Sequence, residues 1–224
     1  MIESLIESLR AQANPANVAG MARYGINPAG TLGVPVHVLR RMAKECGRGH
    51  ALAEQLWSSG IHEARILATL VDEPALVTAR QMDRWARDID SWDVCDHACH
   101  NLFRDSPRAF AKAAQWARVR REFVRRAGFS LMAGLAVKAK DADDEQFAAF
   151  LPLIAEAASD DRNMVKKAVN WALRNVGKRN RRLHKLAIAA AEEIREQDSR
   201  TARWIAADAL RELRNPATVG RIKT

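Results

Sequence analysis

The chain has few cysteines and no long apolar run. Its 224 residues include three Cys, at positions 46, 95 and 99, and this odd, low count argues against a disulfide framework and fits a reducing compartment. No stretch of about 18 apolar residues predicts a membrane span. The first residues mix acidic and apolar side chains and lack the basic start of a signal peptide. We therefore expect a cytoplasmic protein with no membrane contact.

Common motifs of catalysis and cofactor binding are also missing. There is no Walker loop, no GxGxxG after a strand, no CxxC pair and no HExxH. Cys95, Asp96, His97, Cys99 and His100 lie close together, but their spacing does not match a metal site. We expect Cys95 and Cys99 to be small packing residues, and we expect no metal and no cofactor. A spatially assembled Ser-His-Asp set leaves no local signature and stays open.

Helix-forming sequence fills the chain. Ala, Leu, Arg and Glu dominate, and no segment alternates with period two for long enough to predict a strand. We expect helices over residues 2–12 and 17–24, a loop over 25–34, and a helix with Pro35 in its first turn that runs to about Glu45. Later breaks are expected near Gly47–Gly49, Gly60, Glu73-Pro74, Ser91, Ser106-Pro107, Lys140–Asp144, Ser159–Asp161, Gly177–Asn180, Asp198-Ser199 and Asn215-Pro216. Short polar breaks between helices favour helix pairs.

A degenerate repeat supports this interpretation. A β-branched residue, two further residues and then usually a small helix former recur. The copies start at Ile61, Val94, Val124, Val165 and, more weakly, Thr201. Their intervals of 33, 30, 41 and 36 residues have the length of a two-helix solenoid repeat. We predict an all-α fold, an α-α superhelix (solenoid), in a single domain over residues 1–224.

The third position of each copy is charged. These residues are Glu63, Asp96, Arg126, Lys167 and Arg203. Equivalent positions of stacked repeats line one surface, so they form either a shared polar groove or an outer, solvated column. Trp92 precedes Asp96 by four residues, and Trp171 follows Lys167 by four. A large aromatic one helical turn from the column at two repeats favours a binding surface.

The stretch from Asp90 to Asp96 is where we expect the chemistry. If it is helical, Trp92 and Asp96 lie one above the other on the same face. An indole face and a carboxylate together suit a cationic ligand. The alternative is that Trp92 is a core residue and Asp96 a solvated or capping one.

The chain is strongly basic. It has 36 Lys and Arg against 27 Asp and Glu, a formal net charge of +9. Such a balance is typical of proteins that meet a polyanion, most often nucleic acid. Two basic clusters stand out: Arg118, Arg120, Arg121, Arg125 and Arg126, and then Lys166, Lys167, Arg174, Lys178, Arg179, Arg181, Arg182 and Lys185. They are either solvated helix faces or a phosphate-binding surface. The few acids among them favour the surface, and Arg125, Lys166 and Lys178 are candidates for its phosphate contacts.

A set of short motifs, in order over most of the chain, resembles a known family. They are Met21-Ala-Arg-Tyr24, Gly33-Val-Pro35, Trp92-Asp-Val-Cys-Asp96, Val124-Arg-Arg-Ala127 and Lys167-Ala-Val-Asn-Trp171-Ala-Leu-Arg174. The set resembles the DNA alkylation repair glycosylases built from HEAT-like repeats, of the AlkD type. The resemblance implies a solenoid whose concave cleft binds duplex DNA containing alkylated bases. It implies hydrolysis of the N-glycosidic bond of cationic bases, chiefly 3-methyladenine and 7-methylguanine, by a monomer.

The resemblance also implies roles for individual residues. Asp96 matches the family's catalytic Asp, Trp92 and Trp171 match aromatics that contact the backbone and deoxyribose of the lesion, and Arg126 matches the basic residue that closes the cleft. Tyr24, Lys167 and Arg174 match positions near the DNA. Some relatives have a second aromatic directly before the Trp; Ser91 stands there in this chain, so we expect a looser wall.

The chemistry fits these residues. A base alkylated at N3 or N7 already carries positive charge and leaves as a neutral base without a general acid. The site must stabilise the oxocarbenium character of the sugar and place a water, which a carboxylate can do. Each Trp face adds about 0.5–2 kcal/mol of cation–π attraction. Two alternatives remain: a non-catalytic DNA-binding protein of the same family, and a protein-binding solenoid scaffold.

Overall fold

The computed structural model describes residues 2–222, which contain helices and no β-strand. The prediction of an all-α fold is therefore confirmed. Contacts divide the chain into two compact units, unit 1 over residues 1–107 and unit 2 over residues 108–224. The prediction of a single domain over residues 1–224 stays a prediction. Within the described part of the chain, no helix has the length and apolar character needed to cross a membrane.

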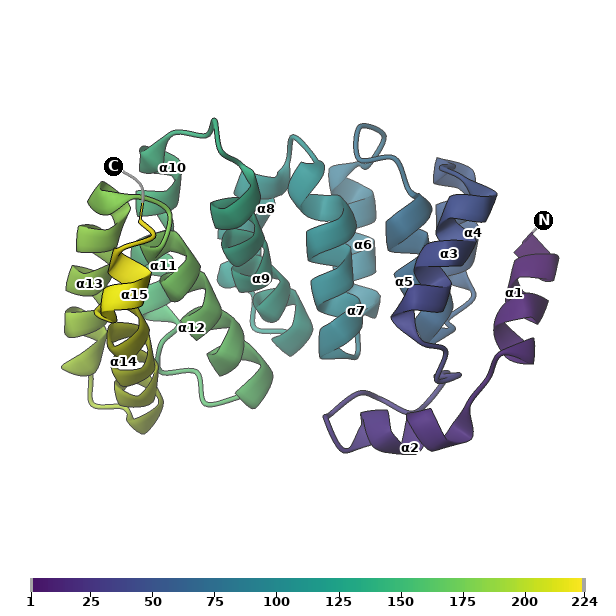
Figure 1. Ribbon diagram of the computed structural model, residues 1–224, viewed down its shortest axis with the longest axis horizontal. Coiled ribbons are helices and arrows are strands. Elements are labelled where there is room, and N and C mark those ends of the chain that lie inside the picture. The colour runs from purple at the N-terminus through teal and green to yellow at the C-terminus, as the bar shows by residue number, and fades with distance from the viewer. Residues whose placement is uncertain (1, 223–224) are drawn as a thin grey trace. The chain divides into compact units, whose positions relative to one another are not determined.

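Unit 1 is built around one buried helix, α5. Its elements are α1 (Ile2–Ala11), α2 (Pro15–Ala22), α3 (Val36–Cys46), α4 (His50–Ser58), α5 (His62–Val71), α6 (Ala79–Asp88), α7 (Trp92–His97), a π-helix η1 (Ala98–Leu102) and a short 3-10 turn η2 (Phe103–Asp105). Helices α3, α4, α7 and η1 all pack against α5. Helix α2 lies crosswise to α3 and α5 and has no buried residue (Figure 1). The unit therefore has a packed centre and one lightly attached helix.

Unit 2 has two layers of helices. Its elements are α8 (Ala109–Ala117), α9 (Glu122–Lys138), α10 (Asp144–Ala148), α11 (Phe150–Glu156), α12 (Asn163–Gly177), α13 (Arg181–Arg195), α14 (Arg200–Leu213) and α15 (Pro216–Val219). One layer contains α9, α12 and α14, which pack side by side, and α8, α11 and α13 pack against that layer. The pairs α8/α9, α11/α12 and α13/α14 are the helix pairs that the repeat predicted.

Side-chain caps explain why many predicted breaks are found. Asn14, Thr78, Asn180 and Ser199 each accept a hydrogen bond from a backbone N–H in the first turn of the following helix. Each such cap stabilises its helix by roughly 0.5–2 kcal/mol. Because Asn14 caps a helix with Pro15 in its first position, α2 begins two residues before the predicted residue 17.

Two breaks were missed, one at residues 118–121 and one at Ala149 between α10 and α11. The first lies inside the first basic cluster, so Arg118, Arg120 and Arg121 belong to a linker and not to a helix face. Helix α8 ends at Ala117 and α9 begins at Glu122, so residues 118–121 are a linker. The linker contains no Gly, Pro, Asn or Ser, and the sequence therefore gave no signal of a turn. The turn is compatible with tight packing because Gly128 of α9 lies against the backbone of Ala117, where a Cβ would come within 2.6 Å of the nitrogen.

Candidate functional site

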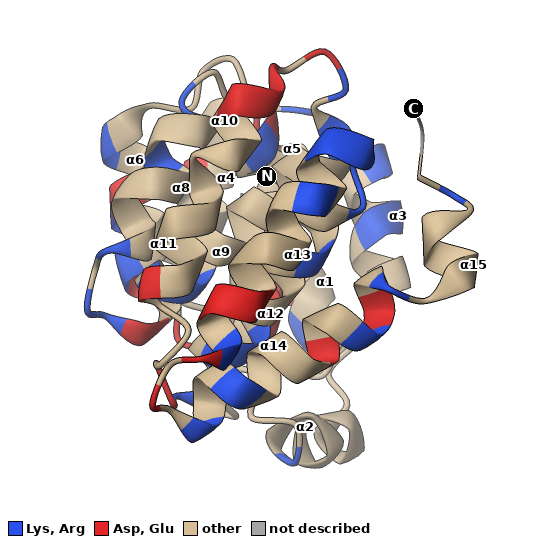
Figure 2. Ribbon diagram, turned by 90° about the vertical axis from the view of Figure 1, so that its left-hand side faces the viewer, with Lys and Arg blue, Asp and Glu red and all other residues tan. Residues whose placement is uncertain are grey.

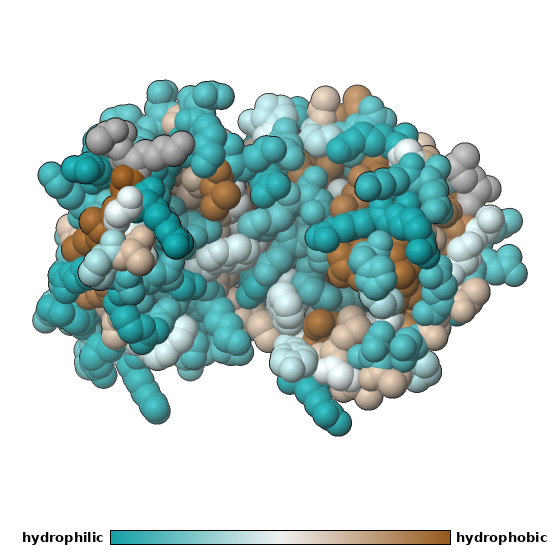
Figure 3. Space-filling model, viewed as in Figure 1, coloured by the Kyte–Doolittle hydropathy of each residue, from teal (hydrophilic) through white to brown (hydrophobic). Residues whose placement is uncertain are grey.

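A pocket of about 730 Å³ opens in unit 1 between α2, the loop that follows it and the α7–η1 segment. Trp92 and Asp96 of α7 both line it, together with Tyr24 at the end of the α2 segment. Its walls also include the apolar side chains Met21 and Val34. Figure 3 shows apolar side chains at the surface of unit 1, on the right-hand side of the view. The structure thus brings three of the predicted site residues to one cavity with apolar walls.

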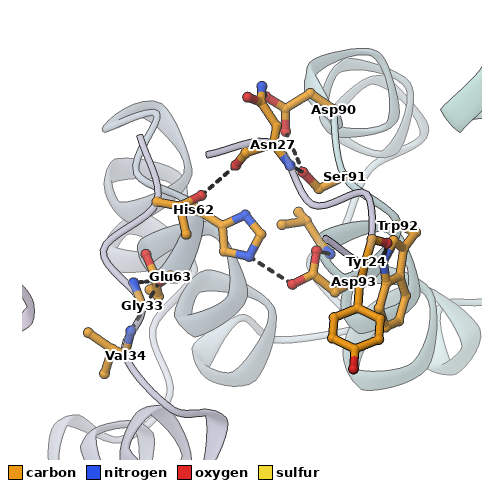
Figure 4. Close-up of polar contacts among 12 residues, drawn as sticks. Tyr24, Asn27, Gly33, Val34, His62, Glu63, Asp90, Ser91, Trp92 and Asp93 are labelled. Atoms are coloured by element: carbon orange, nitrogen blue, oxygen red, sulfur yellow. Dashed lines mark hydrogen bonds and ion pairs between the residues drawn. The ribbon is translucent and has the colours of Figure 1, made fainter. Parts of the chain in front are cut away.

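Hydrogen bonds hold the indole of Trp92 in place. Its Nε1–H donates to the backbone carbonyl of Tyr24 at 3.1 Å, while the Tyr24 residue is 75% exposed (Figure 4). Next to it, the hydroxyl of Ser91 is buried and accepts a hydrogen bond from the backbone N–H of Asn27 at 3.0 Å. The loosening expected at Ser91 is therefore offset by a bond between this wall and the loop.

Glu63 fixes the loop on the other side of the pocket. It is fully buried in the first turn of α5, and its carboxylate accepts hydrogen bonds from the backbone N–H groups of Leu32, Gly33 and Val34 at 2.8, 2.6 and 3.2 Å (Figure 4). Gly33 has φ +81° and lies against Asn14, so a side chain would not fit there. The expectation that Glu63 belongs to a groove or to a solvated column is wrong, because this carboxylate is a buried anchor for backbone amides.

The pocket contains charges of both signs. Asp93 and Asp96 line it, and so do Arg40, His97 and His100. Asp93 is paired with the buried His62, whose Nε2 lies 2.8 Å from Oδ2. Burial lowers the pKa of His97 below its ordinary value of 6.5, and Arg40 and His62 lower it further, although Asp93 and Asp96 act in the opposite direction. The lowered pKa favours an uncharged His97 ring, which then adds no positive charge to the pocket that contains Asp96.

The remaining predicted site residues lie in unit 2. Arg126 of α9 is only 5% exposed, and its guanidinium donates to the backbone carbonyl of Met164 at 2.7 Å. Trp171 of α12 is half-buried and Lys167 is exposed. Thus unit 2 contains the predicted cleft-closing Arg and the second Trp, and unit 1 contains Trp92 and Asp96.

A regular polar row joins α12 to α14. The Nζ of Lys166 lies 4.9 Å from the ring centroid of Trp204, and the side-chain amide of Asn170 donates to Asp208 at 2.7 Å. One turn further on, Arg174 pairs with Glu212, and Lys178 reaches the same carboxylate at 2.6 Å. Burial alone would raise the pKa of Glu212, but the hydrogen bonds and charges of Lys178 and Arg174 outweigh it and hold this pKa below its ordinary value. The positive charges of Arg174 and Lys178 are therefore partly compensated within unit 2.

Arg125 is also engaged within unit 2. It donates to the backbone carbonyl of Ala117 at 3.0 Å and to Asp160 at 2.9 Å. Asp160 accepts from Arg162 as well. Burial alone would raise the pKa of Asp160, but its bonds to Arg162 and the charge of Arg125 hold it below the ordinary value of 3.8. Arg162 also donates to the backbone carbonyl of Arg120 at 2.7 Å, so this cluster connects the linker before α9 to the segment before α12.

Charge is distributed unequally between the two units. Residues 1–107 contain 11 Lys and Arg and 13 Asp and Glu, a formal net charge of −2. Residues 108–224 contain 25 Lys and Arg and 14 Asp and Glu, a formal net charge of +11. Figure 2 shows Lys and Arg on α13 and α14, with Asp and Glu among them. The excess positive charge that a polyanion would meet thus belongs entirely to unit 2.

Sequence reasoning missed the partners of several residues around the pocket. Glu63, His62 and Ser91 act through partners about 30 to 64 positions away, and no local pattern marks such pairs. Asn101 was also missed; it lines the pocket from η1, the π-helix that directly follows α7. π-helical turns are frequent at functional sites. Among the described residues, no three His, Cys, Asp or Glu side chains are grouped as a metal site would require.

Comparisons with known proteins agree with this architecture. Residues 5–213 match the model of the DNA alkylation repair enzyme family, so the chain belongs to that family. No curated protein matches the chain significantly. A solved structure described as a new family of proteins related to the HEAT-like repeat DNA glycosylases with affinity for branched DNA structures has a TM-score of 0.77 at 18% identity, over 94% of each chain. The chain therefore has the HEAT-like repeat solenoid fold. A designed armadillo repeat protein in complex with a (KR)4 peptide gives a TM-score of 0.39 at 14% identity, over 82% of this chain and 78% of that one, too low for an argument.

Proposed function

We propose that the protein is a DNA glycosylase that removes cationic alkylated purines, such as 3-methyladenine and 7-methylguanine, from duplex DNA. The observation that carries the proposal is the pocket of unit 1, where the indole of Trp92 and the carboxylate of Asp96 line one cavity. An aromatic face and an anion together favour a positively charged sugar or base.

The reaction needs few groups because the substrate is already activated. As the N-glycosidic bond breaks, its electron pair moves to the base, which leaves neutral, and positive charge develops on the sugar. Asp96 stabilises that charge electrostatically and accepts a hydrogen bond from the attacking water. The water oxygen then bonds to C1′ and its proton passes to the carboxylate or to solvent. Trp92, held by Tyr24, presents its ring beside the developing charge.

Unit 2 supplies the attraction for the phosphate backbone. Its net charge of +11 and the exposed Lys167 suit a polyanion, whereas unit 1 carries a net charge of −2. Each phosphate contact releases counterions, so binding must weaken as salt rises. We further propose that the protein acts as a monomer in the cytoplasm.

Base release tests the proposal directly. Duplex DNA that contains a single 7-methylguanine is incubated with the protein at moderate salt, with and without a chelator, and free base is quantified. We expect release that the chelator does not reduce. The matched control is the Asp96→Asn variant, prepared in the same way. Tight DNA binding without release of 7-methylguanine or 3-methyladenine would contradict the proposal.

A second candidate function is non-catalytic binding of branched DNA. It is favoured by the similarity to the solved structure described with affinity for branched DNA structures. The two functions separate in one comparison, because a branch-binding protein prefers a four-way junction to an alkylated duplex and releases no base. If the protein neither binds DNA nor releases a base, a protein-binding scaffold is the remaining alternative.

A further inference from the structure

A chain of three polar side chains leads from the core of unit 1 to the wall of the pocket. Thr69 is a buried residue of α5, Asn101 belongs to the π-helix η1, and His97 is the last residue of α7. The amide nitrogen of Asn101 lies 3.0 Å from Oγ1 of Thr69 and 3.1 Å from Nδ1 of His97. His97 and Asn101 both line the pocket that contains Asp96.

The direction of each hydrogen bond in this chain is determined. The hydroxyl of Thr69 has one proton, which it donates to the backbone carbonyl of Ile66 at 2.7 Å. Its oxygen must therefore accept from Asn101, and only the amide nitrogen of an Asn side chain can donate. The second N–H of that amide then faces Nδ1 of His97, which must accept. A neutral ring that accepts at Nδ1 carries its proton on Nε2.

The charged groups around His97 do not reverse this arrangement. Asp93 and Asp96 of α7 favour a protonated ring, whereas burial, Arg40 of α3 and His62 of α5 oppose it, and burial is the largest effect. His100 of η1 lines the same pocket. Protonation at Nδ1 would also set two N–H donors against each other across 3.1 Å. Geometry and environment therefore both disfavour an imidazolium.

We propose that Thr69, Asn101 and His97 form a relay that keeps the His97 ring neutral with its proton on Nε2, as a positioning residue beside Asp96. Its role in the reaction rests on the proposed glycosylase function. A pocket for a cationic base is weakened by each added positive side chain, and a neutral His97 ring adds none to a pocket that already contains Arg40. The Nε2–H still provides a donor that can orient a water or a sugar oxygen.

Nuclear magnetic resonance tests the relay without any substrate. The full chain is labelled with ¹⁵N at its histidine rings, long-range ¹⁵N–¹H correlations identify the protonated nitrogen, and a His97→Gln variant assigns the signals. We expect Nδ1 without a proton and Nε2 with one at neutral pH, and a titration midpoint below the ordinary value of 6.5. A proton on Nδ1, or a midpoint at or above that value, overturns the proposal.

Substitution of Asn101 supplies the second test. In Asn101→Asp a carboxylate faces Nδ1 and favours the charged ring, so we expect base release at neutral pH to fall by about tenfold. The acid limb of the pH–rate profile should move to higher pH. His97→Gln keeps a neutral N–H at the ε position and should retain much more activity than His97→Ala. Equal losses in these two variants, with an unmoved acid limb in Asn101→Asp, would show a merely structural role.

The two proposals fail in different ways. A wild-type protein that releases no base but shows the neutral ring with Nε2–H contradicts the glycosylase function and supports the relay. A wild-type protein that releases base but carries the proton on Nδ1 supports the glycosylase function and overturns the relay. The spectrum of the unmodified protein decides the relay even if an Asn101 variant fails to fold, because it needs only the His97→Gln variant for its assignment.

Discussion

The indole N–H of Trp92 is bonded to the backbone carbonyl of Tyr24, 68 positions earlier in the chain. This bond connects the start of α7 to the segment that follows α2, and both line the pocket. It restricts the orientation of the Trp92 ring beside the pocket. Because a substitution can remove this bond and keep an aromatic ring, the effect of the ring's orientation can be measured separately from the effect of its presence.

Trp92→Phe removes the bond and keeps an aromatic face. A hydrogen bond of this kind contributes about 0.5–1.5 kcal/mol, so we expect single-turnover base release to fall by roughly three- to tenfold. Trp92→Ala removes the face as well and should cost clearly more. Equal rates for Trp92→Phe and the wild type would show that the bond to Tyr24 does not orient the reacting ring.

Asp96→Asn keeps the size of the side chain and removes its charge. We expect DNA binding to change little and base release to fall by about 10²–10⁴-fold, because electrostatic stabilisation and water placement are both lost. Binding is measured by fluorescence anisotropy and release by single-turnover kinetics. Unchanged turnover would remove Asp96 from the mechanism.

Salt dependence distinguishes exposed from paired basic residues in unit 2. Lys167 is exposed, whereas Arg174 shares Glu212 with Lys178. If Lys167 contacts a phosphate, Lys167→Ala should reduce the slope of log K against log salt by about 0.9. Arg174→Ala should reduce it less, because Glu212 already compensates part of the charge of Arg174.

Arg126→Ala should weaken binding and flatten the salt dependence if Arg126 contacts a phosphate. Because this guanidinium is 5% exposed and bonded to Met164, the variant's unfolding must be measured beside its binding. An unaltered salt slope in a folded variant would argue against the phosphate contact.

Glu63→Gln tests the anchor of the pocket loop. The substitution replaces a carboxylate that accepts three backbone N–H groups with an amide that has a single acceptor oxygen. We expect the free energy of unfolding to fall by about 1–3 kcal/mol. We also expect the loop of residues 25–34 to become more sensitive to limited proteolysis. Glu45→Gln is the matched control: Glu45 is exposed and forms a surface ion pair with Arg41 on the same helix, so its substitution should change little.

Asp160 predicts a pH dependence of stability. Its pKa is below 3.8 in the folded protein, so the unfolded chain binds the proton more readily. Its contribution is fully present above 3.8 and is lost as the pH falls through the lowered native pKa. Asp160→Asn should destabilise the protein at neutral pH by about 1–3 kcal/mol and reduce the acid sensitivity of unfolding. Asp161 is an exposed neighbour, and Asp161→Asn should leave both the stability at neutral pH and the acid sensitivity of unfolding nearly unaltered.

Much of the fold could be predicted from the sequence because its signals are local. Asn14-Pro15, Gly60 and Asn180 mark helix ends through capping and turn chemistry that acts over a few residues. The linker at residues 118–121 carries no such chemistry, and its turn is set by packing of α8 on α9. Helix boundaries that local capping and turn residues mark were predicted, and the boundary that packing alone sets was not.

The site was predictable only in part, for a related reason. Trp92 and Asp96 share one face because they are one helical turn apart, a relation that sequence spacing contains. The buried carboxylate of Glu63 and the unit 2 partners of Arg174 and Arg125 depend on residues about 30 to 40 positions away. The charge of each side chain is known from the sequence. Whether another side chain compensates that charge depends on the fold and cannot be predicted from the sequence in the same way.

The π-helix after α7 has one further consequence. Such a turn contains one more residue than an α-helical turn along the same path, so it is what a single-residue insertion into a regular helix leaves behind. Loss of one residue from Ala98–Leu102 would restore an ordinary helix and rotate Asn101 away from Thr69. The flanking α7 and η2 would keep their packing. The link between Asn101 and Thr69 could therefore be lost through one codon, whereas Asp93, Asp96 and His97 belong to α7 and lie outside the π-helix.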